Sequence, residues 1–165
     1  MRIGHGYDAH QIISGSGMVL GGVEIKCDYS IEAHSDGDII VHSLIDALLG
    51  AAAYGDLGTF FPSSDENLKG ISSFSMLSTV LEKLSHDNYT INNIDITYVG
   101  QVPKLLQYRE DIIKNLSKAM EIDPHRISCK ATTTDKLGFE GNLEGISCHC
   151  VVLIEKLTDA KNITL

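Results

Sequence analysis

The pattern of hydrophobic and polar positions indicates extended segments in the first part of the chain and a helical period after them. Residues 3–10 can form a strand, and the apolar run over residues 18–25, interrupted by Gly21 and Gly22, predicts a hairpin. Apolar residues then recur every three or four positions over residues 38–53, which predicts a helix. The later pattern predicts a loop over 58–70, helices over 73–84 and 105–120, and strands over 94–99, 127–132 and 146–155.

The order of these elements indicates the fold class. Strands come first, helices follow, and the last strands alternate with a helix, without an internal repeat or linker. This order predicts an α+β fold: a two-layer sandwich in which helices cover one face of a mixed β-sheet. Residues 1–157 are expected to form the single domain and residues 158–165 a polar tail. Because one sheet face stays without helices, self-association is expected.

The ends of the helix over residues 38–53 have recognisable signals. Ser35 or Asp36 can cap its start, and Gly55 can end it.

Composition and charge narrow the classes of partner. A formal net charge of -9 over 165 residues argues against a nucleic-acid polyanion, so bound phosphates need local amides, lysines or a metal ion. The sequence has no apolar run of about 20 residues and no secretory signal pattern at its start, so no membrane association is expected. Cys148 and Cys150 share one strand face as core thiols, which favours a reducing, cytoplasmic location.

The strongest chemical pattern is a predicted metal site. Asp8 and His10 lie two residues apart on the first strand, so their side chains share a face. His42, on the following helix, offers a third ligand, and three protein ligands with one open position are typical of catalytic zinc. Asp38 and Asp46 lie one turn from His42 and can hold its other ring nitrogen. Each histidine taken alone is more often an ordinary core or surface residue.

Two further segments can receive phosphate. The HSDGD step at residues 34–38 precedes a helix, and amides at a helix N-terminus attract anions. A simple capping turn would also explain it. The segment KATTTDKLGF at residues 130–139 ends a strand in three threonines and an aspartate, although threonines are also common strand formers. The QVPKLL segment at residues 101–106 is a comparable junction that places Lys104 near helix amides.

Several long segments, in order, resemble the 2-C-methyl-D-erythritol 2,4-cyclodiphosphate synthase family of the non-mevalonate isoprenoid pathway. They are GHGYDAH, AHSDGDIIVHSLIDALLGAAAYGDLG, FFP, QVPKLL and KATTTDKLGFEG, and the resemblance extends over nearly the whole chain. It implies a lyase that closes a cyclic diphosphate by intramolecular attack of a 2-phosphate on a cytidyl-activated β-phosphate, releasing CMP.

The resemblance also implies roles for individual residues. Asp8, His10 and His42 would bind Zn²⁺, Asp135 would bind Mg²⁺ or Mn²⁺, and His34 and Thr133 would assist catalysis. The implied substrate contacts are His34, Ser35, Asp56, Gly58, Phe61, Asp65, Gly100, Lys104, Leu105, Leu106, Ala131, Thr132, Thr133 and Phe139. Family members are homotrimers with active sites between subunits.

The chain departs from the family pattern at three positions. Ser63 follows Phe-Pro where an acid is usual, with Asp65 close by, and Asp135 replaces the more familiar glutamate. Asn142 stands where an arginine often faces the trimer cavity, so binding of an isoprenoid diphosphate there is not implied.

Two other functions fit the residues taken without the resemblance. A zinc hydrolase would use the metal ion to activate water, and a non-catalytic nucleotide-binding module would hold zinc structurally. A structural zinc site usually has four protein ligands, whereas the sequence offers three convincing ones.

Overall fold

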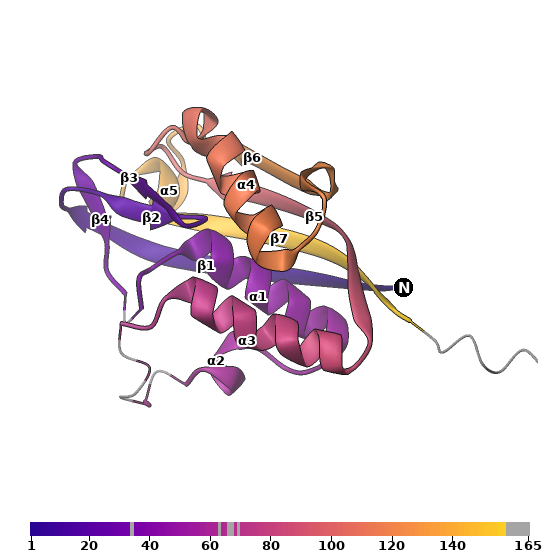
Figure 1. Ribbon diagram of the computed structural model, residues 1–165. Coiled ribbons are helices and arrows are strands. Elements are labelled where there is room, and N and C mark those ends of the chain that lie inside the picture. The colour runs from indigo at the N-terminus through magenta and orange to yellow at the C-terminus, as the bar shows by residue number, and fades with distance from the viewer. Residues whose placement is uncertain (34, 63, 66–67, 69, 158–165) are drawn as a thin grey trace, which may run out of the picture.

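The computed structural model describes residues 1–33, 35–62, 64–65, 68 and 70–157, so His34, Ser63 and the expected tail over residues 158–165 lie outside the described residues. One mixed sheet, one small hairpin and several helices make up the fold (Figure 1). The strands are β1 (Arg2–Ser14), β2 (Met18–Leu20), β3 (Val23–Ile25), β4 (Tyr29–Ile31), β5 (Tyr89–Val99), β6 (Ile127–Thr132) and β7 (Gly145–Lys156). The helices are α1 (Ile39–Ala52), α2 (Leu57–Phe60), α3 (Ser73–His86), α4 (Arg109–Met120) and α5 (Gly138–Gly141), with 3₁₀ turns η2 (Leu105–Tyr108) and η3 (Pro124–Arg126).

The main sheet has the strand order β4-β1-β7-β5-β6. Its three long strands, β1, β7 and β5, pair antiparallel, whereas β5 and β6 pair parallel. The parallel pair needs a crossover, and η2 and α4 supply it. The expectation of an α+β fold with a mixed sheet is confirmed, and α1, α3 and α4 lie on one side of that sheet (Figure 1).

Two glycines of β1 allow α1 to lie directly on the sheet. A Cβ atom on Gly4 would come within 1.9 Å of the Ala47 carbonyl oxygen, and one on Gly6 within 2.0 Å of the Ser43 carbonyl oxygen. Any side chain at these positions would therefore push α1 away. The close approach brings the next residues of β1 that face α1 beside the side chains of that helix.

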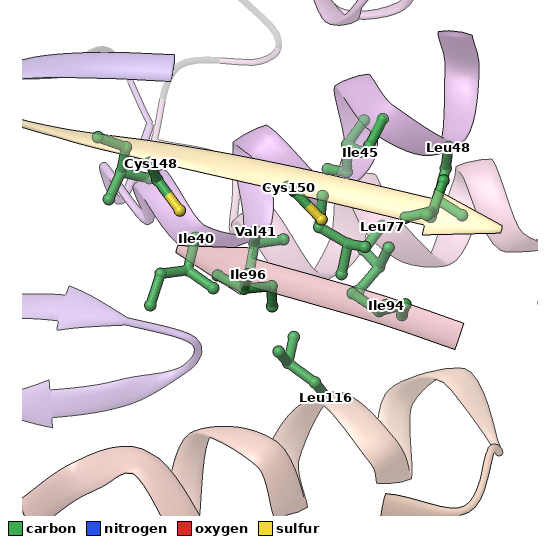
Figure 2. Close-up of a cluster of buried hydrophobic side chains, with 14 of the residues drawn as sticks. Ile40, Val41, Ile45, Leu48, Leu77, Ile94, Ile96, Leu116, Cys148 and Cys150 are labelled. Atoms are coloured by element: carbon green, nitrogen blue, oxygen red, sulfur yellow. The ribbon is translucent and has the colours of Figure 1, made fainter. Parts of the chain in front are cut away.

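The hydrophobic core lies between the sheet and these helices. Figure 2 shows Cys148 and Cys150 of β7 among side chains of α1, β5 and α4. Both cysteines are fully buried, and burial raises the pKa of the Cys148 thiol to about 12. All four cysteines are free, so the prediction of core thiols at these two positions is confirmed.

The start of α1 differs from the sequence prediction. Neither Ser35 nor Asp36 caps it; the Asp38 side chain accepts a hydrogen bond from the Val41 N–H. The same carboxylate accepts two N–H groups of the turn between β2 and β3, at 2.8 and 2.7 Å. Asp38 thus fastens the hairpin to the helix, a contact between segments that local periodicity does not encode.

The ends of other helices and strands also differ from those that the sequence predicted. Helix α1 ends at Ala52 and is capped by Ala53, which adopts a left-handed conformation with φ 60°, and not by Gly55. Short elements that the pattern did not predict are α2 within the expected loop, α5, and β4. The expected helix over residues 105–120 begins as the 3₁₀ turn η2 before α4.

The sheet face opposite α1 is uncovered in the single chain. Ile3 is 73% exposed, Tyr7 47% and Val151 42%, although all three are large and apolar. None of the described helices has the length and apolar character required to cross a membrane.

Candidate functional site

Three predicted metal ligands converge where β1 meets α1. Asp8 and His10 leave β1 toward the helix, and His42 comes from the second turn of α1. The Asp8 Oδ2 atom lies 3.0 Å from His10 Nε2 and 3.0 Å from His42 Nδ1, and those two nitrogens are 3.2 Å apart. Among the described residues, this is the one group of three or more possible ligands within 4.8 Å of one another.

The charge state of Asp8 suits a cation. Burial raises the pKa of Asp8, but hydrogen bonds from His10 and His42 outweigh burial and lower it to about 2. One carboxylate and two imidazoles therefore offer an ionised oxygen and two nitrogens, a donor set that accepts a divalent metal ion. The predicted ligand residues are brought together and can hold such an ion.

Serine hydroxyls hold the second nitrogen of His42. Its Nε2 atom lies 3.0 Å from Ser73 Oγ and 3.1 Å from Ser35 Oγ. The Ser73 hydroxyl donates to a carboxylate oxygen of Asp36, whose other oxygen accepts the Ser73 N–H at 2.9 Å. With its proton directed to Asp36, Ser73 Oγ accepts Nε2–H from His42. When a metal ion replaces the proton between Nδ1 and the Asp8 carboxylate, this arrangement keeps the Nδ1 lone pair directed at that ion.

This arrangement corrects the prediction that Asp38 or Asp46 contacts His42. Asp38 is fully buried and accepts backbone N–H groups, as described above. Asp46 accepts the Leu57 N–H at 3.1 Å and so fixes the start of α2. Helical spacing placed both carboxylates on one stripe with His42, but their oxygens accept backbone N–H groups of other segments.

A cavity of about 510 Å³ opens beside the metal-ligand triad. Five predicted substrate contacts line it, namely Ser35, Asp56, Gly58, Phe61 and Asp65. His34, the remaining predicted contact of this region, lies outside the described residues, as does Ser63.

The carboxylate of Asp56 is held in place at this cavity. It caps α2 by accepting hydrogen bonds from both the N–H and the hydroxyl of Thr59, each at 2.7 Å, and these bonds lower its pKa. An ionised acceptor at the cavity wall can receive substrate hydroxyl groups.

The other predicted residues lie elsewhere in the chain. Gly100 follows β5, and its N–H donates to the Thr132 carbonyl oxygen at the end of β6. Thr133 and Asp135 follow in the exposed segment after β6. Nine described residues predicted to contact substrate or magnesium are absent from the lining of the cavity: Gly100, Lys104, Leu105, Leu106, Ala131, Thr132, Thr133, Asp135 and Phe139.

The residues of this second group differ in whether their side chains are exposed and so can contact a ligand. Leu105 is only 3% exposed and packs in the core, so its backbone, not its side chain, is available to a ligand. Leu106 is 77% exposed. Beside them, the Gln101 Nε2 atom is buried and has no hydrogen-bond partner among the described residues. A buried amide donor without a partner costs stability, and a ligand acceptor would satisfy it.

Several site residues had not been predicted. Tyr7, Leu57, Leu68, Ile71 and Met76 line the cavity, and Ser73 contacts His42. Tyr7 is adjacent to Asp8, a proximity that could have indicated it. Ser73 stands 31 residues from His42, and no local pattern marks it.

Comparisons with known proteins agree over almost the whole chain. The model of the YgbB family matches residues 1–155. The 2-C-methyl-D-erythritol 2,4-cyclodiphosphate synthase of Prochlorococcus marinus is 46% identical over 157 residues, which is 94% of each chain. The enzyme of the same name from Lachnospira eligens is 43% identical over 159 residues, covering 96% of this chain and 87% of that protein.

Solved structures give the same result. The structure described as IspF of Plasmodium falciparum in complex with CDP is 39% identical to this chain, with a TM-score of 0.84. The match covers 95% of this chain and 97% of the Plasmodium chain. The bifunctional IspDF from Campylobacter jejuni is 36% identical, with a TM-score of 0.91 over 94% of this chain. This chain spans 42% of that longer protein.

Proposed function

Since the chain belongs to the YgbB family, we infer that it converts 4-diphosphocytidyl-2-C-methyl-D-erythritol 2-phosphate to 2-C-methyl-D-erythritol 2,4-cyclodiphosphate and releases CMP. It is a phosphorus–oxygen lyase of the non-mevalonate route to isoprenoid precursors. The observation that supports this activity best is the convergence of Asp8, His10 and His42 beside a cavity large enough for a sugar phosphate.

We propose that these three residues hold Zn²⁺ and that Asp135 holds Mg²⁺ or Mn²⁺. One carboxylate and two imidazoles, without a fourth protein ligand in the described group, are typical of catalytic zinc. The exposed Asp135 offers carboxylate oxygen, the donor that Mg²⁺ and Mn²⁺ prefer. When bound, such ions supply positive charge to phosphoryl oxygens.

The chain's own residues place the reacting groups. We propose that His34 and Ser35 receive a phosphate next to the triad, while Asp56 and Gly58 contact the hydroxyl groups of the sugar. Phe61 and Asp65 would border the sugar on the other side of the cavity. The exposed Thr133 hydroxyl would donate to the diphosphate as negative charge shifts during the reaction.

No strong general base is required. The attacking 2-phosphate oxygen is already anionic; it forms a bond to the β-phosphorus while the bond from that phosphorus to the CMP oxygen breaks. The main obstacle is the repulsion between two anionic groups, so positioning and charge neutralisation supply the catalysis.

We propose that the active site is completed by another copy of the chain in a homotrimer. Gly100, Lys104 and Thr132, with their neighbours, would form the cytidine pocket, and they are absent from the cavity of their own chain. The unpartnered Gln101 amide supports ligand binding at that second region. The exposed apolar residues of the uncovered sheet face support association through that face. Light scattering should give a trimer, and a stable active monomer would refute the shared site.

We also propose that residues 1–157 act as one catalytic domain in the cytoplasm. The four free thiols support a reducing compartment.

Product analysis tests the activity. Phosphorus NMR of the protein incubated with the cytidyl substrate should show CMP and a cyclic diphosphate appearing together. An open-chain phosphate product would instead identify a hydrolase in which the metal ion activates water.

A further inference from the structure

A second pair of histidines lies on the uncovered face of the sheet. The His5 Nε2 atom is 3.2 Å from the His149 Nδ1 atom, and the two rings stack with centroids 5.5 Å apart. The Tyr7 ring packs against His149 with a centroid distance of 4.8 Å. The two imidazoles therefore already face each other through ring nitrogens.

Strand register produces this pair. Strands β1 and β7 run antiparallel with Tyr7 opposite His149 and His5 opposite Val151, so the two histidines are diagonal neighbours on one face. Gly4 and Gly6 face α1, so the intervening His5 points to the other side of the sheet. The pair is thus separated by the sheet from the triad of the proposed active site.

The surroundings of His5 and His149 differ from those of a histidine in an ion pair with a carboxylate. In the part of the chain that the structure describes, the two rings contact each other and Tyr7, and neither contacts a carboxylate. Exposed apolar side chains, including Ile3 and Val151, occupy the same face. A lone N–H···N hydrogen bond would use one proton and leave one nitrogen on each ring available.

We propose that His5 and His149 form a second metal site, which binds a divalent transition metal such as Zn²⁺ or Cu²⁺. Two metal–nitrogen bonds of about 2.0–2.1 Å at a tetrahedral angle separate the nitrogens by roughly 3.3–3.4 Å, close to the 3.2 Å observed. The separation between His10 Nε2 and His42 Nδ1 is also 3.2 Å. Imidazole suits Zn²⁺ and Cu²⁺, and Cu²⁺ binds most tightly in the divalent series.

The remaining coordination positions can be filled by water or by another copy of the chain. Because the pair lies on the face proposed for self-association, its copies in an assembly would approach one another. The proposal itself needs only the two histidines of one chain and does not depend on the cyclase activity.

Counting bound zinc tests the proposal. The purified protein is dialysed against buffered free Zn²⁺, and zinc per chain is measured by elemental analysis. The expected wild-type value is one equivalent at the triad plus a weaker additional amount: one more per chain, or one per three chains if copies share an ion. His5→Ala and His149→Ala should each lose the additional zinc and keep the first equivalent.

Two further variants separate this proposal from the proposed function. His42→Ala should lose the first equivalent and turnover but keep the additional zinc, and the exposed His125→Ala should keep both. His149→Asn, with thermal melting followed by circular dichroism, serves where an alanine variant unfolds. A wild-type value limited to one equivalent, or additional zinc that survives in both His5→Ala and His149→Asn, would overturn the second site.

Discussion

Replacing Ser73 by alanine should weaken metal binding at the triad without removing a ligand. Ser73 is fully buried, and its hydroxyl lies between the Asp36 carboxylate and His42 Nε2. The hydroxyl therefore fixes which ring nitrogen of His42 carries the proton. Alanine removes the hydroxyl and keeps the backbone N–H that donates to Asp36.

The expected magnitude follows from the partners that remain. Losing a group that orients a metal-bound histidine typically costs 10–100-fold in metal affinity. Because Ser35 Oγ still lies 3.1 Å from Nε2 in the Ser73→Ala variant, we expect about tenfold, or about 1.4 kcal/mol. Removing both hydroxyls in a Ser35→Ala, Ser73→Ala double variant should approach a hundredfold loss.

Zinc affinity is measured by competition with a chromophoric chelator at fixed pH. Nitrogen-15 NMR of His42 in the zinc-bound protein reports the protonated nitrogen independently of activity, and Nε2 should carry the proton in the wild type. Ser78→Ala is the matched control, because this exposed serine lies on the same helix, α3. Unchanged zinc affinity in the double variant, or a wild-type Nε2 without a proton, would refute the reasoning.

Three other changes test separate parts of the structure. Thr133→Ala should lower kcat by about 10²-fold with little change in KM, because its contact is proposed to strengthen as charge shifts; a raised KM with unchanged kcat would assign it to substrate binding. Gly6→Ala should lower the free energy of unfolding in urea by about 3 kcal/mol, since its Cβ would meet a backbone oxygen of α1 at 2.0 Å. A Cβ atom on Gly50, within α1, would meet no other atom within 4 Å, so Gly50→Ala should raise the free energy of unfolding by about 0.5–1 kcal/mol. Similar effects of the two glycine substitutions would contradict the close approach of α1 to β1. Burial raises the pKa of Asp38 to about 6 in the folded protein, so the folded state holds a proton that the unfolded chain releases near pH ~4. The contribution of Asp38 to stability is therefore full below about pH 4 and is lost as the pH rises to about 6, and a pH slope unchanged in Asp38→Asn would contradict this assignment.

The sequence by itself determined the elements whose periodicity is local. The extended segment over residues 3–10 lies within β1, the helical spacing was sufficient to predict α1, and β6 was predicted with its observed bounds. The two-residue spacing of Asp8 and His10 predicted a shared face, because successive strand side chains point to opposite faces. His42 could be added because it is the histidine of the mostly apolar helix that follows.

Only the tertiary structure decided which groups meet across long separations. Ser73 is 31 residues from His42 and 37 from Asp36, and Asp38 contacts a hairpin 16 and 17 residues away. Such contacts depend on how closely α1 approaches β1, and the hydrogen-bonding capacity of a serine or aspartate does not reveal its partner. Strand register likewise decided that His5 and His149 face each other, because pairing between β1 and β7 joins positions from opposite ends of the chain.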